Sequence, residues 1–278
     1  MTEQEYRAVP AVNISSLKDM AKSALHYQVG LENERKDTAA MFAGRAFHMA
    51  ILEPDRFLKT YINKPEGFDG RTAFGKQFIR DNADKELIDH KLGSALKGMR
   101  ESILLHADAG PDLLRAVATE LPIFWIDPET GLPCKAKIDE LRDDGAAIDW
   151  KKTANIEPAL FFAQAYKLNY HVQAAFYVDG LIANGIDVPE YKINAVEGEF
   201  PFDVAPYRVP EDILNEGRAV YHEWLRKVAE YRKSGLVRWP GVVPVTCDFA
   251  LPNYARWKSA VEEDFSDDIS GILEGEKE

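Results

Sequence analysis

The spacing of hydrophobic residues changes near residue 120, from the three-and-four interval of helices to the alternation of strands. Before that point we expect five helical segments, over about 16–27, 38–52 and three further stretches between 71 and 118. Ser15 or Ser16 can begin the first helix, with Asp19 completing a weak capping box. Glu53-Pro54 can end the second, because proline cannot continue the helical hydrogen bonds. The first third of the chain is therefore predicted to form a helical layer.

Polar and apolar side chains alternate after Glu120, as expected for half-buried strands. Three strands are predicted, over 121–127, 133–141 and 146–153. Pro128-Glu129-Thr130-Gly131 and Asp143-Asp144-Gly145 have the composition of tight turns between them. Short turns join antiparallel neighbours, so these strands should form an antiparallel meander.

The remainder of the chain mixes helices and strands. We expect a helix opening near Pro158, a helix over 170–183, strands over 191–196 and 202–209, and a long helix over 210–233. Trp239-Pro240-Gly241 should begin an irregular end. The order of elements predicts an α/β or α+β fold in a single domain, residues 1–258, followed by an acidic tail over 259–278 that we expect to be disordered.

The composition is compatible with one sizeable domain, since the chain has 278 residues and 46% hydrophobic content. No run of apolar residues approaches the length of a transmembrane helix, and the first ten residues are polar, so we expect no secretory signal, no membrane span and a cytoplasmic location. The two cysteines, Cys134 and Cys247, lie far apart. They predict reduced thiols and exclude a four-cysteine metal site.

The net charge of −12 argues against a nucleic-acid partner, because proteins that bind phosphate backbones are usually basic. The distribution of the charge weakens that objection. Residues 261–278 contain eight acids and one base, so −7 of the −12 belongs to the tail. A cluster of carboxylates that binds cations would account for part of the rest.

Acidic side chains interrupt the predicted meander at two points. Asp139 lies near the end of one strand and Asp149 lies in the next. The turn between the strands should bring them together, and alternation places Lys151 on the face of Asp149 with Trp150 opposite. Two such carboxylates repel each other unless a cation separates them. Glu120, at the start of the neighbouring strand, can join from the side.

This arrangement suits metal-dependent hydrolysis of a phosphodiester. A divalent metal held by carboxylates provides an activated water and stabilises the charge on the phosphate, and magnesium favours oxygen ligands. Lys151 can position the water and stabilise the developing oxyanion. Acids near hairpin ends often do no more than keep turns soluble, but Asp149 interrupts an otherwise apolar run, and further motifs flank the pair.

The order of these motifs resembles the PD-(D/E)xK nucleases. Asp139 followed by Asp149-Trp150-Lys151 looks like the signature of that group. Gly44-Arg45-Ala46-Phe47-His48 and Gln173-Ala174-Ala175-Phe176-Tyr177 look like the GxxxH and QxxxY motifs of its RecB-like branch. Residues 9–18, 52–57, 127–132 and 170–177, with Trp239-Pro240-Gly241, are similar to the exonuclease VIII (RecE C-terminal nuclease domain) family. The resemblance covers roughly residues 9–257.

The resemblance implies a PD-(D/E)xK nuclease core, in which a central mixed sheet contains the antiparallel meander and is flanked by helices. Asp139, Asp149 and the backbone carbonyl of Trp150 would bind the catalytic metal, Mg²⁺, for which Mn²⁺ would substitute. His48 would be a further ligand or would orient one. The residue at the position of Trp150 is usually aliphatic in the family, and the sequence does not explain the tryptophan.

The remaining site residues follow from the same resemblance. Lys151 would position the attacking water, and Glu120 is a candidate catalytic residue of less certain placement. Gln173 and Tyr177 lie one helical turn apart on one face, where they would hold DNA or steady the site.

The family's activity is 5′-to-3′ digestion of linear double-stranded DNA, which leaves 3′ single strands for a RecT-like annealing recombinase. The resemblance implies a ring-shaped homo-oligomer in a bacterial cell, encoded by a phage or prophage. Two alternatives stay open: an endonuclease on the same core, and a DNA-binding scaffold that has lost catalysis. The intact Asp139, Asp149 and Lys151 argue against the scaffold.

Overall fold

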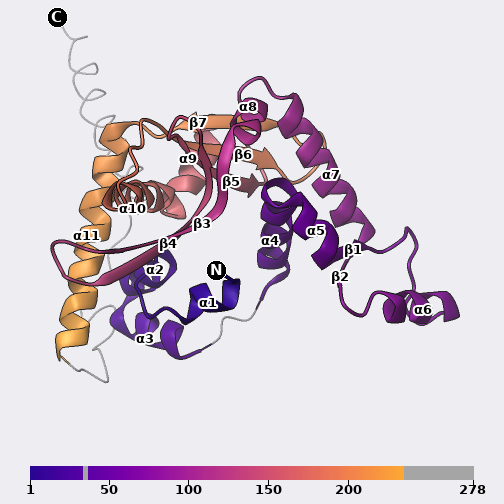
Figure 1. Cartoon of the computed structure of the whole chain (residues 1–278), viewed down its shortest axis with the longest axis horizontal. Coiled ribbons are helices and arrows are strands. Elements are labelled where there is room, and N and C mark those ends of the chain that lie inside the picture. The colour runs from indigo at the N-terminus through magenta and orange to yellow at the C-terminus, as the bar shows by residue number, and fades with distance from the viewer. Residues whose placement is uncertain (34–36, 235–278) are drawn as a thin grey trace, which may run out of the picture. The chain divides into compact units, whose positions relative to one another are not determined.

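A mixed five-stranded sheet forms the centre of the fold in a computed structural model, which describes residues 1–33 and 37–234 (Figure 1). The strand order is β3-β4-β5-β6-β7. The strands are β3 (Ala116–Ile126), β4 (Pro133–Arg142), β5 (Ala147–Thr153), β6 (Tyr191–Glu197) and β7 (Val204–Arg208). The first three form the predicted antiparallel meander, β6 lies parallel to β5, and β7 is antiparallel to β6. The predicted fold class, a mixed sheet flanked by helices, is confirmed.

Helices cover both faces of this sheet and enclose a hydrophobic core on each. One core joins the sheet to α2 (Ile14–Lys22), α3 (Ala24–Glu32), α9 (Pro158–Lys167), α10 (Tyr170–Ala183) and α11 (Glu211–Ser234). The other joins it to α4 (Ala39–Leu52), α7 (His90–Leu105) and α8 (Ala109–Leu114). The alternation of β5 divides its side chains between the cores: Ala147 enters the first, while Ile148 and Trp150 enter the second.

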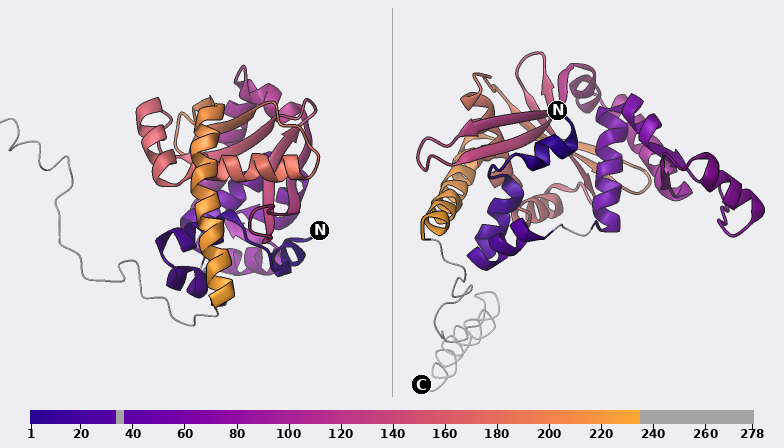
Figure 2. Two further views of the ribbon diagram at one scale, coloured as in Figure 1. Left: turned by 90° about the vertical axis from the view of Figure 1, so that its left-hand side faces the viewer. Right: turned by 60° about the horizontal axis from the view of Figure 1, so that its bottom comes forward.

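A smaller group of elements extends from the second layer. It comprises α5 (Pro54–Thr60), β1 (Tyr61–Asn63), α6 (Ala73–Asp81) and β2 (Glu86–Ile88), and α6 lies at its far end (Figure 2). β1 and β2 pair in parallel over three residues each. We did not predict these two strands, because three residues are too few to show alternation.

Several predicted helix and strand boundaries differ from those in the structure. The expected first helix is two helices, because Ser23 ends α2 and caps α3. Asn13 caps α2 in a reciprocal box with Ser16, so the predicted box with Asp19 does not form. Pro54 occupies the first turn of α5, where a proline is tolerated, and therefore opens a new helix as well as following the end of α4. β3 begins at Ala116, five residues earlier than predicted.

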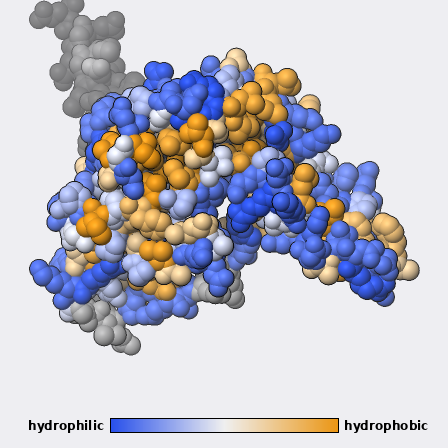
Figure 3. Space-filling model, viewed as in Figure 1, coloured by the Kyte–Doolittle hydropathy of each residue, from blue (hydrophilic) through white to orange (hydrophobic). Residues whose placement is uncertain are grey.

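The sequence did not predict α1 (Glu3–Ala8) at the beginning of the chain. Predictions for Trp239-Pro240-Gly241, Cys247 and the acidic tail fall outside the described residues. Within residues 1–33 and 37–234, no helix has the length and apolar character needed to cross a membrane. The face shown in Figure 3 is mainly hydrophilic, with apolar surface gathered in a few patches.

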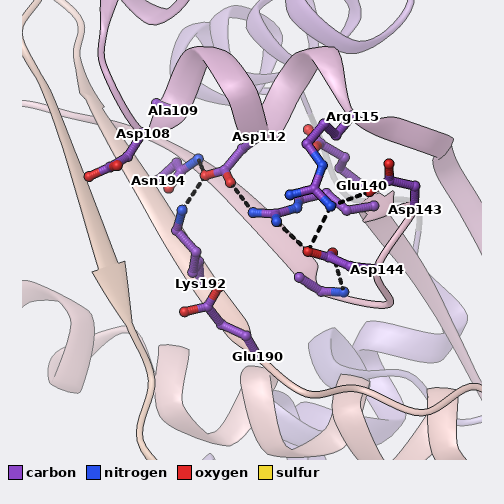
Figure 4. Close-up of polar contacts among 12 residues, drawn as sticks. Asp108, Ala109, Asp112, Arg115, Glu140, Asp143, Asp144, Glu190, Lys192 and Asn194 are labelled. Atoms are coloured by element: carbon purple, nitrogen blue, oxygen red, sulfur yellow. Dashed lines mark hydrogen bonds and ion pairs between the residues drawn. The ribbon is translucent and has the colours of Figure 1, made fainter.

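A buried polar network lies on the second face of the sheet, around Asp112 of α8 (Figure 4). Asp112 is 1% exposed. Its carboxylate accepts hydrogen bonds from Arg142 of β4, at 2.5 Å, and from Lys192 and Asn194 of β6. Arg142 also pairs with Asp144 in the β4–β5 turn. One carboxylate thus connects α8 to two strands that are separated by β5.

We expect Asp112→Ala to lower the free energy of unfolding by about 3–5 kcal/mol, because it leaves buried cations without their partner. Asp112→Asn, which keeps a hydrogen-bond acceptor, should cost less. Asp108→Ala is the matched control, since Asp108 is an exposed acid at the start of the same helix and its side chain does not cap it. Denaturant unfolding measures all three. Equal losses for Asp112→Ala and Asp108→Ala would contradict the structural role of the network.

Candidate active site

The β4–β5 hairpin opens at the predicted site. The two strands pair only at Glu140↔Ile148 and Leu141↔Ala147, next to the turn. Beyond those pairs the backbone N–H of Trp150 donates to the Asp139 carboxylate at 2.9 Å instead of to a carbonyl of β4. The ladder between β4 and β5 therefore ends beside the acids that we expected to lie close together.

Three potential metal ligands meet at the opening. His48 Nδ1 of α4 lies 3.6 Å from Asp139 Oδ2 and 3.7 Å from Glu120 Oε1, and the ligand atoms of the three residues lie within 4.8 Å of one another. The side chains of His48, Glu120 and Asp139 keep 26%, 21% and 13% of their exposure, so the group is open to solvent on one side. An imidazole with two carboxylates is a donor set that fits a divalent cation.

Glu120 reaches this group through an unusual backbone. The register Thr119↔Glu140 and Leu121↔Ile138 sets Glu120 opposite Asp139, and cross-strand neighbours share a face of the sheet. Its φ of +49° lies in the left-handed region, which costs energy for a residue with a side chain. We expected Glu120 at the start of a strand, whereas it lies in the middle of β3.

Asp149 lies beside the three-ligand group with a different set of partners. Its carboxylate is 3% exposed and pairs with the Lys151 ammonium at 2.6 Å. The Gln173 side-chain amide of α10 donates to it at 2.8 Å. Lys151 and Asp149 thus share a face of β5, as alternation predicts. Gln173, which follows Asp149 in the sequence, contacts its carboxylate. Within the described residues, the compact group of metal ligands does not include Asp149.

The ionisable groups at the site shift one another's pKa values. Burial raises the pKa of Asp139 to about 6; Asp149 adds to this effect, while His48 and Lys151 oppose it. Burial alone would lower the pKa of His48, but Asp139 and Glu120 outweigh it and raise that pKa. Burial likewise acts against the charge of Lys151, whose pKa is nevertheless raised by Asp149 and Asp139. The carboxylates favour the charged forms of His48 and Lys151, and they still repel each other.

Tyr177 lies on α10 near the same acids. Burial raises the pKa of its phenol well above the ordinary value, and the charges of Asp139 and Asp149 raise it further. The phenol therefore stays neutral beside the carboxylates. Its predicted role in holding DNA or steadying the site stays a prediction.

Two lysines at the site were not predicted from the sequence. Lys137 of β4 contacts Glu120 at 3.1 Å and also pairs with Glu3 of α1. Lys18 of α2 lies 5.8 Å from the centre of the Tyr170 ring, which Lys151 contacts at 5.0 Å. The period of two places Lys137 on the face of Asp139 and is a signal that sequence analysis can use. Lys18 is brought in by tertiary packing alone.

A hydrogen bond on the second face of the sheet explains why residue 150 is a tryptophan. Its side chain is fully buried, and its indole N–H donates to Glu140 Oε2 at 2.8 Å. Glu140 is also fully buried, and burial raises its pKa to about 7. An aliphatic residue would fill the space but leave this carboxylate without its donor. Trp150 and Glu140 therefore form a hydrogen-bonded polar pair inside an otherwise apolar core.

The sequence model of a family described as "PDDEXK-like domain of unknown function (DUF3799)" matches residues 13–247. A comparison with curated proteins finds no match. A candidate exonuclease from Eubacterium rectale has a similar structure, with 15% identity and a TM-score of 0.59 over 86% of this chain and 88% of that one. At this identity the likeness is one of fold, and it agrees with the observed sheet.

Two further structures resemble the chain more distantly. An alkaline exonuclease from Laribacter hongkongensis, LHK-Exo, has 14% identity and a TM-score of 0.34 over 84% of this chain and 97% of that one. LHK-Exo in complex with dAMP has 13% identity and a TM-score of 0.30 over 71% and 97%.

We expect Trp150→Phe to lower the free energy of unfolding by about 1–3 kcal/mol beyond the loss of contact area, because it leaves the Glu140 carboxylate buried without a donor. Trp125→Phe is the matched control. Trp125 is partly buried, and its indole N–H has no hydrogen-bond partner among the described residues. Thermal or denaturant unfolding compares the two. A loss for Trp125→Phe as large as that for Trp150→Phe would show that ring volume, not the hydrogen bond, sets the cost.

Proposed function

The chain belongs to the PDDEXK-like family whose sequence model it matches, and we propose on that premise that it is a metal-dependent exodeoxyribonuclease acting on linear double-stranded DNA. The observation that carries the proposal is the group of His48, Glu120 and Asp139 next to the Asp149–Lys151 pair. A cation site beside a buried ammonium is what hydrolysis of a phosphodiester requires. The candidate exonuclease fold of the Eubacterium rectale protein is consistent with it.

We assign the metal to His48, Glu120 and Asp139, with Asp149 and the carbonyl of Trp150 as the further ligands implied by the motif. Bound metal would supply Lewis acidity and charge neutralisation at the scissile phosphate. Mg²⁺ is the proposed ion because most of these donors are oxygens, and Mn²⁺ would substitute because it accepts both carboxylate and imidazole. Glu120 thus moves from a candidate catalytic residue to a ligand.

The other residues position groups around that centre. Lys151 keeps its proton because Asp149 and Asp139 stabilise the charge, so it acts as a fixed cation that orients the attacking water and the phosphate oxygens. Gln173 fixes the Asp149 carboxylate through its side-chain amide. Tyr177 closes the buried side of the site as a neutral phenol.

The finer features rest on the resemblance to the exonuclease VIII family. These are 5′-to-3′ polarity, the release of 3′ single strands to a RecT-like annealing recombinase, a ring-shaped homo-oligomer and a phage or prophage origin. An endonuclease on the same core is the second candidate, because the site residues are the same for both. A catalytically inactive DNA-binding scaffold is the third, and the paired Asp149 and Lys151 count against it.

Lys151→Ala should reduce magnesium-dependent nucleotide release from linear DNA by at least about 100-fold, the scale on which removing one oxyanion-stabilising donor acts. Metal binding and DNA binding should remain. Lys152→Ala is the matched control, since Lys152 is the next residue of β5 and is exposed. Acid-soluble nucleotide release measures both variants, and circular dichroism checks folding. Equal activity in the two variants would remove Lys151 from the site, and an unfolded Lys151→Ala protein would make its role structural.

Linear and closed circular duplexes separate the two enzymatic candidates. We expect an end-labelled linear duplex to be degraded from its ends in the presence of Mg²⁺, while a covalently closed circle stays intact, because a free end is needed for entry. Gel electrophoresis follows both substrates. Cutting of the circle would reject the exonuclease and favour the endonuclease, and no cutting of either would favour the scaffold.

A further inference from the structure

Lys18 differs from the other lysines around the site, because no acceptor for its charge lies among residues 1–33 and 37–234. Lys151 pairs with Asp149, and Lys137 pairs with Glu120 and Glu3. Lys135 donates to the backbone carbonyls of the segment that follows α1 and of α1 itself. In that part of the chain no carboxylate lies within ion-pair distance of Lys18, and its ammonium lies over the Tyr170 ring.

The position of Lys18 is rigidly determined by the packing of α2. Ile14, Leu17 and Met20 bury one face of this helix in the first core. The residue before its cap, Val12, exchanges two backbone hydrogen bonds with the start of β4, each at 2.8 Å. α2 is therefore tied to the strand that bears Asp139, and Lys18 cannot move far from the site without breaking that connection.

The Tyr170 ring brings the free lysine next to the catalytic one. Lys18 lies 5.8 Å and Lys151 5.0 Å from the same ring centre. A contact with an aromatic ring stabilises an ammonium less than a charged acceptor does. Burial and, to a smaller extent, the charge of Lys151 lower the pKa of Lys18 to about 8, against the attraction of Asp149. An anion bound between the two ammoniums would relieve both effects.

We propose that Lys18 is a substrate-binding residue that contacts a backbone phosphate of the DNA beside the scissile phosphodiester held near Lys151. The inference rests on the proposed function, because it takes nucleic acid as the substrate. It assigns to α2 a share of the binding surface that the motif residues do not provide. The net charge of the chain is −12, so a cation near the site such as Lys18 would supply local attraction for phosphate.

Binding of a short fluorescent duplex, measured by anisotropy in EDTA over a series of salt concentrations, tests the proposal without hydrolysis. We expect Lys18→Met to weaken binding and to reduce the slope of log K against log salt by about 1, the value for one lost phosphate contact. Lys18→Arg should restore both the affinity and the slope. Lys22→Met is the matched control on the same helix, because Lys22 is exposed and pairs with Asp19. Thermal unfolding of each variant checks that α2 remains folded.

The outcomes separate this inference from the proposed function. Wild-type nucleotide release with Mg²⁺, together with equal binding by the Lys18→Met and Lys22→Met proteins, would overturn the role of Lys18 and leave the nuclease intact. A Lys18-dependent slope without any nucleotide release would support the contact and reject hydrolysis. Binding that is lost equally in Lys18→Met and Lys18→Arg would show a structural role for the residue, and a wild-type protein that does not bind duplex would overturn the proposal.

Discussion

The separation of β4 from β5 is the constraint on which the site depends. In a continuous antiparallel ladder the N–H of Trp150 would donate to a backbone carbonyl of β4. Here that N–H is satisfied by the Asp139 carboxylate instead, so the ladder can end after two residue pairs without leaving a buried donor unpaired. The same bond orients Asp139 toward His48 and Glu120. One hydrogen bond therefore both opens the sheet and aligns a ligand.

Charge compensation explains how so many ionisable groups share this opening. Asp139 has a basic partner in His48 of α4. Asp149 has an amide partner in Gln173 of α10 and a basic partner in Lys151 of its own strand. Burial nevertheless keeps the pKa of Asp139 raised to about 6.

The second face of the sheet buries several polar side chains, which is unusual for the interior of a sheet packed on helices. The Trp150–Glu140 pair and the network around Asp112 lie on the same side of β4, β5 and β6, within a layer of otherwise apolar side chains. Hydrogen bonds of this kind are directional, whereas apolar contacts are not. They hold the strands in one register, so that Asp149, which lies on the same face of β5 as Ala147, keeps its position.

Much of this could be predicted from the sequence, because local rules governed it. Alternation assigned Asp149 and Lys151 to one face and Trp150 to the other, and the turn at Asp143-Asp144-Gly145 paired the strands. The contact of Gln173 with Asp149 was not predicted. Tertiary structure alone decided which ligands form the compact group, since Glu120 joins through a strained backbone and a strand register. It also decided that Trp150 meets Glu140 and that Lys18 reaches Tyr170. Those contacts depend on how helices and strands distant in sequence pack together, and periodicity specifies the face of an element but not its neighbour.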